Sequence, residues 1–96
     1  MRARQPAVYI LASKRMGTLY IGVSSNLQNR LVQHGDSTHE SFAGKYSVYR
    51  LVHCEYFDTM NEAIAREKQL KKWERAWKIR LIEEHNPEWR DLSEDL

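Results

Sequence analysis

The chain has 96 residues, a formal net charge of +2 at neutral pH, and 42% hydrophobic residues. This length fits one small domain, and no stretch approaches the roughly 20 apolar residues of a membrane span. Cys54 is the only cysteine, which excludes an intrachain disulfide and a thiolate zinc site. The charged N-terminus is not followed by an apolar run of signal-peptide type, so we expect a cytoplasmic protein.

Charge is distributed unevenly along the chain. Residues 1–80 contain 14 Lys or Arg and 7 Asp or Glu, a balance of +7, whereas residues 81–96 contain 1 and 6, a balance of −5. A basic body with an acidic tail is typical of a protein with a polyanion-binding face. A well-solvated surface with a soluble tail would give the same pattern.

The first predicted unit is a β-hairpin. Residues 8–11 and 19–23 alternate as strands do, and the polar segment 14–18 between them contains a glycine. Alternation places the aliphatic side chains on one face of both strands. We expect the phenols of Tyr9 and Tyr20 on the other face, at diagonal positions.

A helix is expected over residues 25–35, because Ser25 and Gln28 have the spacing of a capping box and Gly35 is a natural stop. Arg30 and His34 are one turn apart beside its leucine stripe. From there they can share a surface with the two tyrosines. Alternatively, Arg30 only packs its stem on the core.

The irregular segment 36–46 is long for a small domain, and long loops are often functional. It ends at Lys45, which is either a phosphate contact or a solvated loop lysine. The next strand is expected over 47–57. Its apolar residues occur at both parities, which predicts a central strand covered on both faces.

Thr59 and Glu62 form a second capping box and predict a helix over 60–72. Glu67 falls in the apolar register of this helix, where a carboxylate is costly unless it is paired or binds a metal. An ion pair with Lys71, four residues on, is the alternative.

A further helix is expected over 74–84, with Trp73 and Trp77 interpreted as core residues. Asn86 and the following proline end it, and the acidic tail is expected to fray. Basic residues decorate this helical pair, and some are candidates to follow a nucleic-acid backbone: Arg66, Lys68, Lys71, Lys72, Arg75, Lys78 and Arg80.

In combination these features resemble the GIY-YIG nuclease superfamily, whose two naming motifs here read Ala7-Val8-Tyr9 and Tyr20-Ile21-Gly22. The first motif departs from the name, since alanine and valine replace glycine and isoleucine, but its tyrosine is kept. The resemblance covers roughly residues 6–90 and is carried by this ordered set: the hairpin, Arg30, His34, Lys45-Tyr46, Glu67 and Asn86-Pro87-Glu88-Trp89. It is strongest to small, stand-alone bacterial members described as endonucleases.

The resemblance implies an α+β fold with a small three-stranded, mostly antiparallel sheet and helices in the order β-β-α-β-α-α. We expect one domain over residues 1–96, with a core over about 6–86 and an acidic tail over about 87–96. The implied function is a metal-dependent DNA endonuclease, structure-selective and linked to DNA repair or processing.

The resemblance also implies roles for individual residues. Glu67 would hold one Mg²⁺ or Mn²⁺ ion, Arg30 would grip the phosphate, and Tyr9 would be the general base. Tyr20 would orient the water or Tyr9, and His34 would assist proton transfer or bind phosphate. The remaining assignments are nucleic-acid contacts at Lys45, Lys68, Lys71 and Lys72, and supporting roles for Gly22 and Asn86.

Two rival functions stay open at this stage. The first is a nucleic-acid-binding module on the same fold that does not cleave, because fold alone does not determine function. The second is an interaction protein built on the Trp73 and Trp77 helices. We expect DNA as the partner, whether branched, flap or single-stranded, no membrane association, and a monomer or weak dimer.

Overall fold

The computed structural model describes residues 5–35 and 49–95, without the side chains of residues 32–35 and 94. The elements are β1 (Ala7–Ala12), β2 (Leu19–Ser24), α1 (Leu27–Gly35), β3 (Arg50–Tyr56), α3 (Met60–Lys72), α4 (Arg75–His85) and the 3-10 turn η1 (Leu92–Asp95). This arrangement confirms the predicted α+β class and the order β-β-α-β-α-α.

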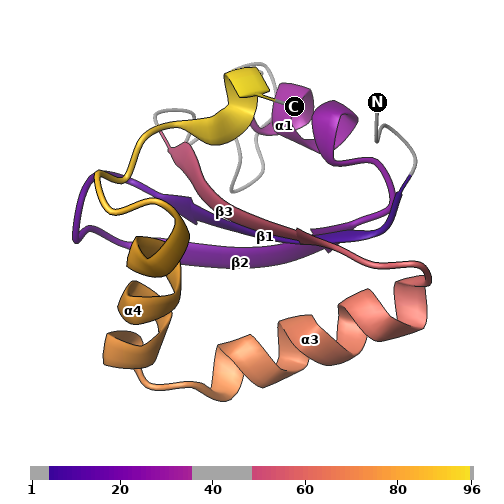
Figure 1. Ribbon diagram of the computed structural model, residues 1–96. Coiled ribbons are helices and arrows are strands. Elements are labelled where there is room, and N and C mark those ends of the chain that lie inside the picture. The colour runs from indigo at the N-terminus through magenta and orange to yellow at the C-terminus, as the bar shows by residue number, and fades with distance from the viewer. Residues whose placement is uncertain (1–4, 36–48, 96) are drawn as a thin grey trace.

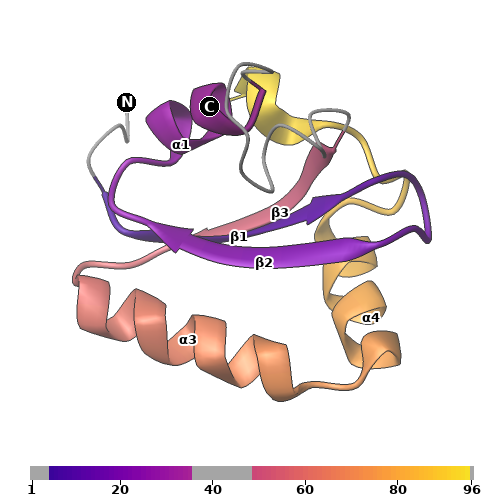
Figure 2. The ribbon, with the colours of Figure 1, turned by 180° about the vertical axis from the view of Figure 1, so that it is seen from behind.

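The three strands form one antiparallel sheet in the order β2-β1-β3. Helices α3 and α4 lie on one face, and α1 and η1 lie on the other (Figures 1 and 2). Every residue of β1 is buried, because it is paired on both edges and covered on both faces. The sheet is therefore the middle layer of the molecule, and β2 is one of its edges.

Strand alternation separates two hydrophobic clusters, one on each face. The cluster under α3 and α4 includes Val8 and Ile21 of the hairpin together with Leu70, Ile82 and Trp89. The cluster under α1 includes Tyr9 and Leu27. The strand register pairs residue 9 with 22 and residue 11 with 20, so the predicted diagonal arrangement of the two tyrosines is confirmed.

The N-terminus of α1 differs from the predicted capping box at Ser25. Asn26 is the capping residue, since its Oδ1 accepts from the backbone N–H of Asn29 at 3.1 Å. Ser24 Oγ in turn accepts from the N–H of Asn26 at 3.0 Å. Both Asn and Ser are good caps, and in this helix the cap is Asn26, one residue after the predicted Ser25. The second box, of Thr59 and Glu62, is confirmed.

The prediction that the third strand is central was wrong. β3 runs over Arg50–Tyr56 and lies at the edge opposite β2. It is nevertheless covered on both faces, since Val52 belongs to one cluster and Leu51 to the other. Apolar residues at both odd and even positions indicate that both faces of a strand are buried. They do not indicate how many neighbouring strands it pairs with.

The prediction that the acidic tail frays was also wrong. Trp89 is fully buried, and the backbone N–H of Leu51 donates to Asp91 Oδ1 at 3.2 Å. Hydrogen bonds from Ser93 and Leu51 outweigh burial and hold the pKa of Asp91 below its usual range. The tail therefore continues the fold along β3.

The prediction of which tryptophans lie in the core was only partly correct. Trp77, expected in the core, is 49% exposed, whereas Trp89 is one of the largest fully buried side chains. Trp73 is half-buried against the cluster under α3 and α4. No helix in the described part of the chain is long and apolar enough to cross a membrane.

Candidate active site at the edge of the sheet

The phenol of Tyr9 is the centre of the candidate site. Tyr9 lies on the buried central strand, 1% exposed, opposite Gly22 of the edge strand β2. A Cβ built on Gly22 would lie 2.5 Å from both Cζ and Oη of Tyr9, far inside van der Waals contact. The tyrosine ring therefore crosses β2 directly over Gly22, and only a glycine leaves room for its hydroxyl to reach the sheet edge.

Tyr20 accompanies Tyr9 from the diagonal position on β2. The ring centroids are 6.3 Å apart and the ring planes are tilted by 50°, a usual geometry for an aromatic pair. Tyr20 is half-buried against the cluster under α1. A side-chain hydrogen bond links the two phenols, so β1 and β2 present their hydroxyls as one unit.

Arg30 reaches the same surface from α1. Leu27, buried at 1% exposure, anchors the helix on the sheet, while Arg30 itself is exposed. By itself, the positive charge of Arg30 would lower the pKa of the Tyr9 phenol. The guanidinium is thus within electrostatic range of the phenol and still open to a ligand from solvent.

Glu67 approaches from the opposite layer. It lies on α3, which packs mainly against β2 and β1, and its side chain is only 17% exposed. Its carboxylate is among the charges that raise the pKa of Tyr9. Lys71 Nζ lies 3.3 Å from Glu67 Oε2, so the alternative ion pair, four residues apart, is present.

These influences give Tyr9 a pKa well above its ordinary value. Burial is the largest cause, followed by Tyr20, and Glu67 adds to the rise, whereas Arg30 opposes it. The sequence-based mechanism required nearby positive charge to lower this pKa. The balance among the described residues has the opposite sign, because desolvation of a buried phenolate outweighs one exposed guanidinium.

Glu67 is also the candidate metal ligand. In residues 5–35 and 49–95 there is no group of three His, Cys, Asp or Glu side chains placed to hold an ion. A single carboxylate fits Mg²⁺, which keeps several waters and is often bound through one or two carboxylates and substrate phosphates. The donor set therefore suits a hard cation completed by water and phosphate, with Lys71 as the present partner of Glu67.

The remaining predicted site residues are the lysines, His34 and Asn86. Lys68, Lys71 and Lys72 are exposed on α3, as nucleic-acid contacts must be. Lys45 and the side chain of His34 lie outside the described part of the structure.

Asn86 is a structural residue rather than a neighbour of the phenols. Its Nδ2 donates to the carbonyl oxygen of Val52 at 3.2 Å and to that of Arg90 at 2.9 Å, and its Oδ1 accepts from the Arg90 N–H at 3.0 Å. It fixes the end of α4 to β3 and to the tail.

Sequence reasoning missed the role of Arg66, which it grouped with the cations that could follow a backbone. Arg66 Nε donates to Glu55 Oε1 at 2.8 Å, and its guanidinium lies 5.1 Å from the centre of the Trp73 ring. Only the packing of α3 on the sheet brings these groups together. The one available signal was that Arg66 precedes Glu67 and so faces another side of the same helix.

Comparison with known protein families gives a match over the residues that contain these motifs. The model of the GIY-YIG catalytic domain matches residues 5–80. The chain belongs to the GIY-YIG family. The match spans β1 to α4 and includes Tyr9, Tyr20, Arg30 and Glu67, and it establishes a nuclease-type fold.

Similar GIY-YIG relatives are small proteins of about the same length. A UPF0213 protein of Syntrophus aciditrophicus is 39% identical over 85 residues, which cover 84% of this chain and 92% of the relative. A UPF0213 protein of Staphylococcus saprophyticus is 32% identical over 77 residues, covering 80% and 93%. One from Natronomonas pharaonis is 33% identical over 75 residues, covering 78% and 87%. No solved structure matches the chain significantly.

Proposed function

We propose that this chain is a divalent-metal-dependent DNA endonuclease that hydrolyses phosphodiester bonds at the β2 edge of the sheet. The observation that carries the proposal is the convergence on one phenol of groups from three layers. Tyr20, Arg30 and Glu67 all act on Tyr9, whose hydroxyl reaches the edge across Gly22. A buried phenol, an exposed guanidinium and a half-buried carboxylate suit a phosphate ligand better than a core.

Each side chain has a distinct role in the proposal. Arg30 grips non-bridging phosphate oxygens through its planar fork and stabilises the charge that develops in the transition state. Tyr9 takes the proton of the attacking water in its deprotonated, phenolate form, and Tyr20 holds the water or Tyr9 in place. His34 is the alternative proton acceptor, since an ordinary imidazole pKa is close to neutrality.

Glu67 would hold the divalent ion, Mg²⁺ or Mn²⁺, in place of its ion pair with Lys71. The ion supplies Lewis-acid stabilisation of the leaving oxygen. A divalent ion bound to Glu67 would offset the negative charge that contributes to raising the pKa of the Tyr9 phenol. We therefore expect the ion to assist both the deprotonation of Tyr9 and the departure of the leaving oxygen.

A non-cleaving nucleic-acid-binding module is the second candidate function. The observation that favours it is the pair formed by Glu67 and Lys71, since this pair already satisfies the carboxylate that acts on Tyr9 among the described residues. In that case the basic surface of α3 would bind nucleic acid and the phenols would only pack.

Within the endonuclease proposal, the substrate is DNA with an unusual structure, such as a flap, branch or single-stranded region. A domain this small has little surface for reading many bases, so structure selectivity in repair or processing is the finer proposal. We also propose that the chain acts as a single domain in the cytoplasm, as a monomer or weak dimer.

The test is a cleavage assay with purified protein on single-stranded, duplex, flap and branched DNA, in Mg²⁺, Mn²⁺ or EDTA. Glu67→Ala and Arg30→Ala should abolish cleavage, by at least about a hundredfold, with unchanged circular dichroism. Glu74→Ala and Arg15→Ala remove matched exposed charges and should cleave normally. Salt-sensitive DNA binding without cleavage of any substrate would favour the binding module.

A further inference from the structure

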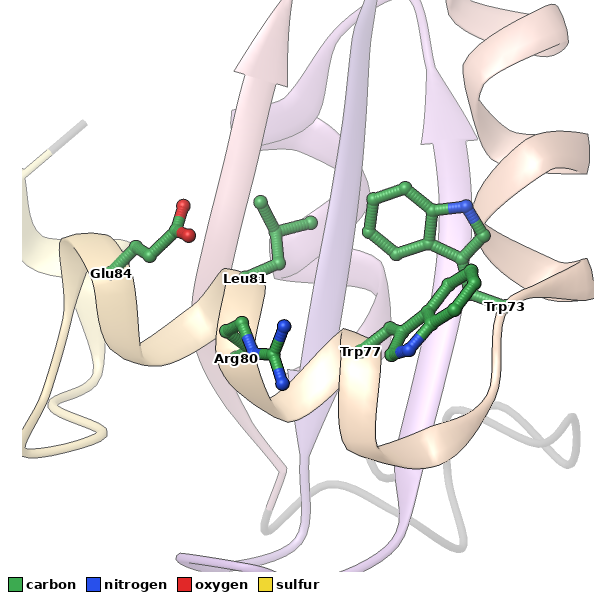
Figure 3. A pocket seen from close by; sticks show the side chains of 5 residues that line it. All are labelled: Trp73, Trp77, Arg80, Leu81 and Glu84. Atoms are coloured by element: carbon green, nitrogen blue, oxygen red, sulfur yellow. The ribbon is translucent and has the colours of Figure 1, made fainter.

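A second candidate site lies where α3 meets α4, apart from the tyrosines. It is a pocket of about 230 Å³ lined by Trp73, Trp77, Arg80, Leu81 and Glu84. Figure 3 shows the two indoles at one end, the Glu84 carboxylate at the other, and Leu81 between them. Trp77, Arg80 and Glu84 are exposed, so the pocket is accessible to a ligand.

The pocket has an aromatic wall that the fold holds in place. The rings of Trp73 and Trp77 meet edge to face, with centroids 5.9 Å apart, and Arg66 stacks on Trp73 at 5.1 Å. Arg66 is itself fixed by its hydrogen bonds to Glu55. Trp77 is left 49% exposed, although nothing in the core requires a tryptophan there.

Size and polarity select the class of ligand. The volume is below the roughly 300 Å³ of the smaller sites for drug-sized ligands, which fits one planar ring system. Glu84 offers an acceptor of the kind that pairs with the exocyclic amino group of cytosine, and Arg80 offers a donor. An aromatic wall with one acceptor and one donor is the chemistry of a nucleobase site.

The charge around the pocket complements a polyanion. Residues 66–85, which include every residue lining the pocket, contain seven Lys or Arg and four Glu, a balance of +3. Glu67 and Trp73 flank the buried stripe of Ala63 and Leu70 on opposite sides of α3, as the helical period requires. The solvent-facing arc between them carries Lys68 and Lys72, both exposed, so cations bridge the two sites.

We propose that this pocket binds an unpaired nucleobase of a nucleic-acid strand, stacked on Trp77 with its amino group donating to Glu84. The inference deepens the proposed function and rests on nucleic acid being the ligand. It makes single-stranded or frayed nucleic acid the preferred substrate, because a paired base cannot enter a pocket on the protein surface. Bases with an exocyclic amino group are preferred over thymine.

The test is binding of fluorescent oligonucleotides in EDTA, where cleavage does not interfere. Probes are oligo(dC), oligo(dT) and an abasic strand of the same length. Trp77→Ala should weaken oligo(dC) binding about tenfold, in the range of base–aromatic stacking, and should leave abasic binding unchanged. Trp77→Phe should retain most of the affinity. Met16→Ala, which removes the other exposed large hydrophobic side chain of the described residues, should change nothing.

Glu84→Ala tests the acceptor. It removes a negative charge and so strengthens binding of every probe, but the preference for oligo(dC) over oligo(dT) should shrink. The proposal is overturned if Trp77→Ala binds oligo(dC) as the parent does, or if it loses affinity equally for the abasic strand. Unchanged DNA binding with altered self-association in sedimentation would overturn it in favour of a protein partner.

The two proposals fail separately. Cleavage that needs Glu67, together with binding that does not depend on Trp77, would overturn the base pocket and leave the nuclease. Trp77-dependent binding of oligo(dC) without cleavage of any substrate would support the pocket and count against the nuclease.

Discussion

At the scale of single residues, the site depends on the lack of a side chain at Gly22. Tyr9 is buried on the central strand, and its hydroxyl reaches the edge only because Gly22 has no Cβ. The same burial that fixes the ring also raises the pKa of the phenol. Placement and protonation of Tyr9 are therefore two consequences of one packing arrangement.

Gly22→Ala should move the Tyr9 ring. The added Cβ would lie 2.5 Å from Cζ and Oη of Tyr9, so the ring must turn away. We expect cleavage to fall about a hundredfold, as a misplacement of about 1 Å can cause, with about 1–3 kcal/mol lost from the free energy of unfolding. Chemical denaturation and the cleavage assay measure both effects. In a Tyr9→Ala background the same change should cost much less stability, and equal costs in both backgrounds would contradict the contact.

The pH dependence of cleavage distinguishes the two candidate bases. A phenol with a raised pKa holds its proton more tightly. If Tyr9 is the base, the rate should therefore rise about tenfold per pH unit without levelling off at about pH 10, the ordinary pKa of tyrosine. If His34 is the base, the rate levels off above about pH 7. Single-turnover rates of the parent, Tyr9→Phe and His34→Ala proteins across this range decide between them, and an unchanged rate in Tyr9→Phe points to His34.

At the scale of elements, α3 presents different chemistry on its two flanks. Glu67 acts on Tyr9 of the hairpin, whereas Arg66 forms an ion pair with Glu55 of β3. Arg66 and His53 both bind the carboxylate of Glu55. This network joins α3 to β3 and supports the aromatic wall of the pocket.

The network predicts a pH-dependent stability. Burial by itself would raise the pKa of Glu55, but hydrogen bonds from His53 and Arg66 outweigh it and lower the pKa to about 2 from 4.5. A carboxyl whose folded pKa is depressed stabilises the fold fully above its unfolded pKa. That contribution is therefore lost as the pH falls from about 4.5 toward 2.

Glu55→Gln should destabilise the protein by about 2 kcal/mol at neutral pH, because it leaves a half-buried guanidinium without its charged partner. It should also flatten the loss of stability between pH 4.5 and 2. Urea denaturation at several pH values measures this, with the exposed Glu74→Gln as a control that should match the parent. A Glu55→Gln curve parallel to that of the parent would show that Glu55 does not titrate in this range.

At the scale of the whole molecule, the C-terminal segment completes the fold. Trp89 is fully buried in the cluster under α3 and α4, although its backbone has a positive φ of 58°. Its indole Nε1 donates to Glu83 Oε2 at 2.7 Å, and Arg50 donates to its carbonyl oxygen at 3.0 Å. The left-handed backbone costs about 1 kcal/mol, which burial of the indole offsets.

The tryptophans should therefore differ sharply in their effect on stability. Trp89→Ala is expected to lower the free energy of unfolding by about 3–5 kcal/mol, as removal of a buried aromatic does. Trp77→Ala, at a half-exposed position, should change it by about 1 kcal/mol or less. Thermal denaturation of the two proteins side by side measures the difference, and similar melting temperatures would contradict the observed packing.

Local patterns predicted most of the elements correctly. The hairpin, the diagonal tyrosines, the Thr59 cap and α3 over residues 60–72 all follow from alternation, helical period and capping spacing. Each of these depends on residues close in sequence, where backbone geometry permits few alternatives. The family motifs likewise indicated which side chains share one surface.

What the sequence by itself determined was therefore the order and type of the elements and the family of the chain. Tertiary structure decided the edge position of β3, the docking of the tail, the burial of Trp89 instead of Trp77, and the direction of the Tyr9 pKa shift. These properties depend on which distant segments exclude water from a given side chain. Burial is a sum over the whole fold, and no local period in the chain encodes it.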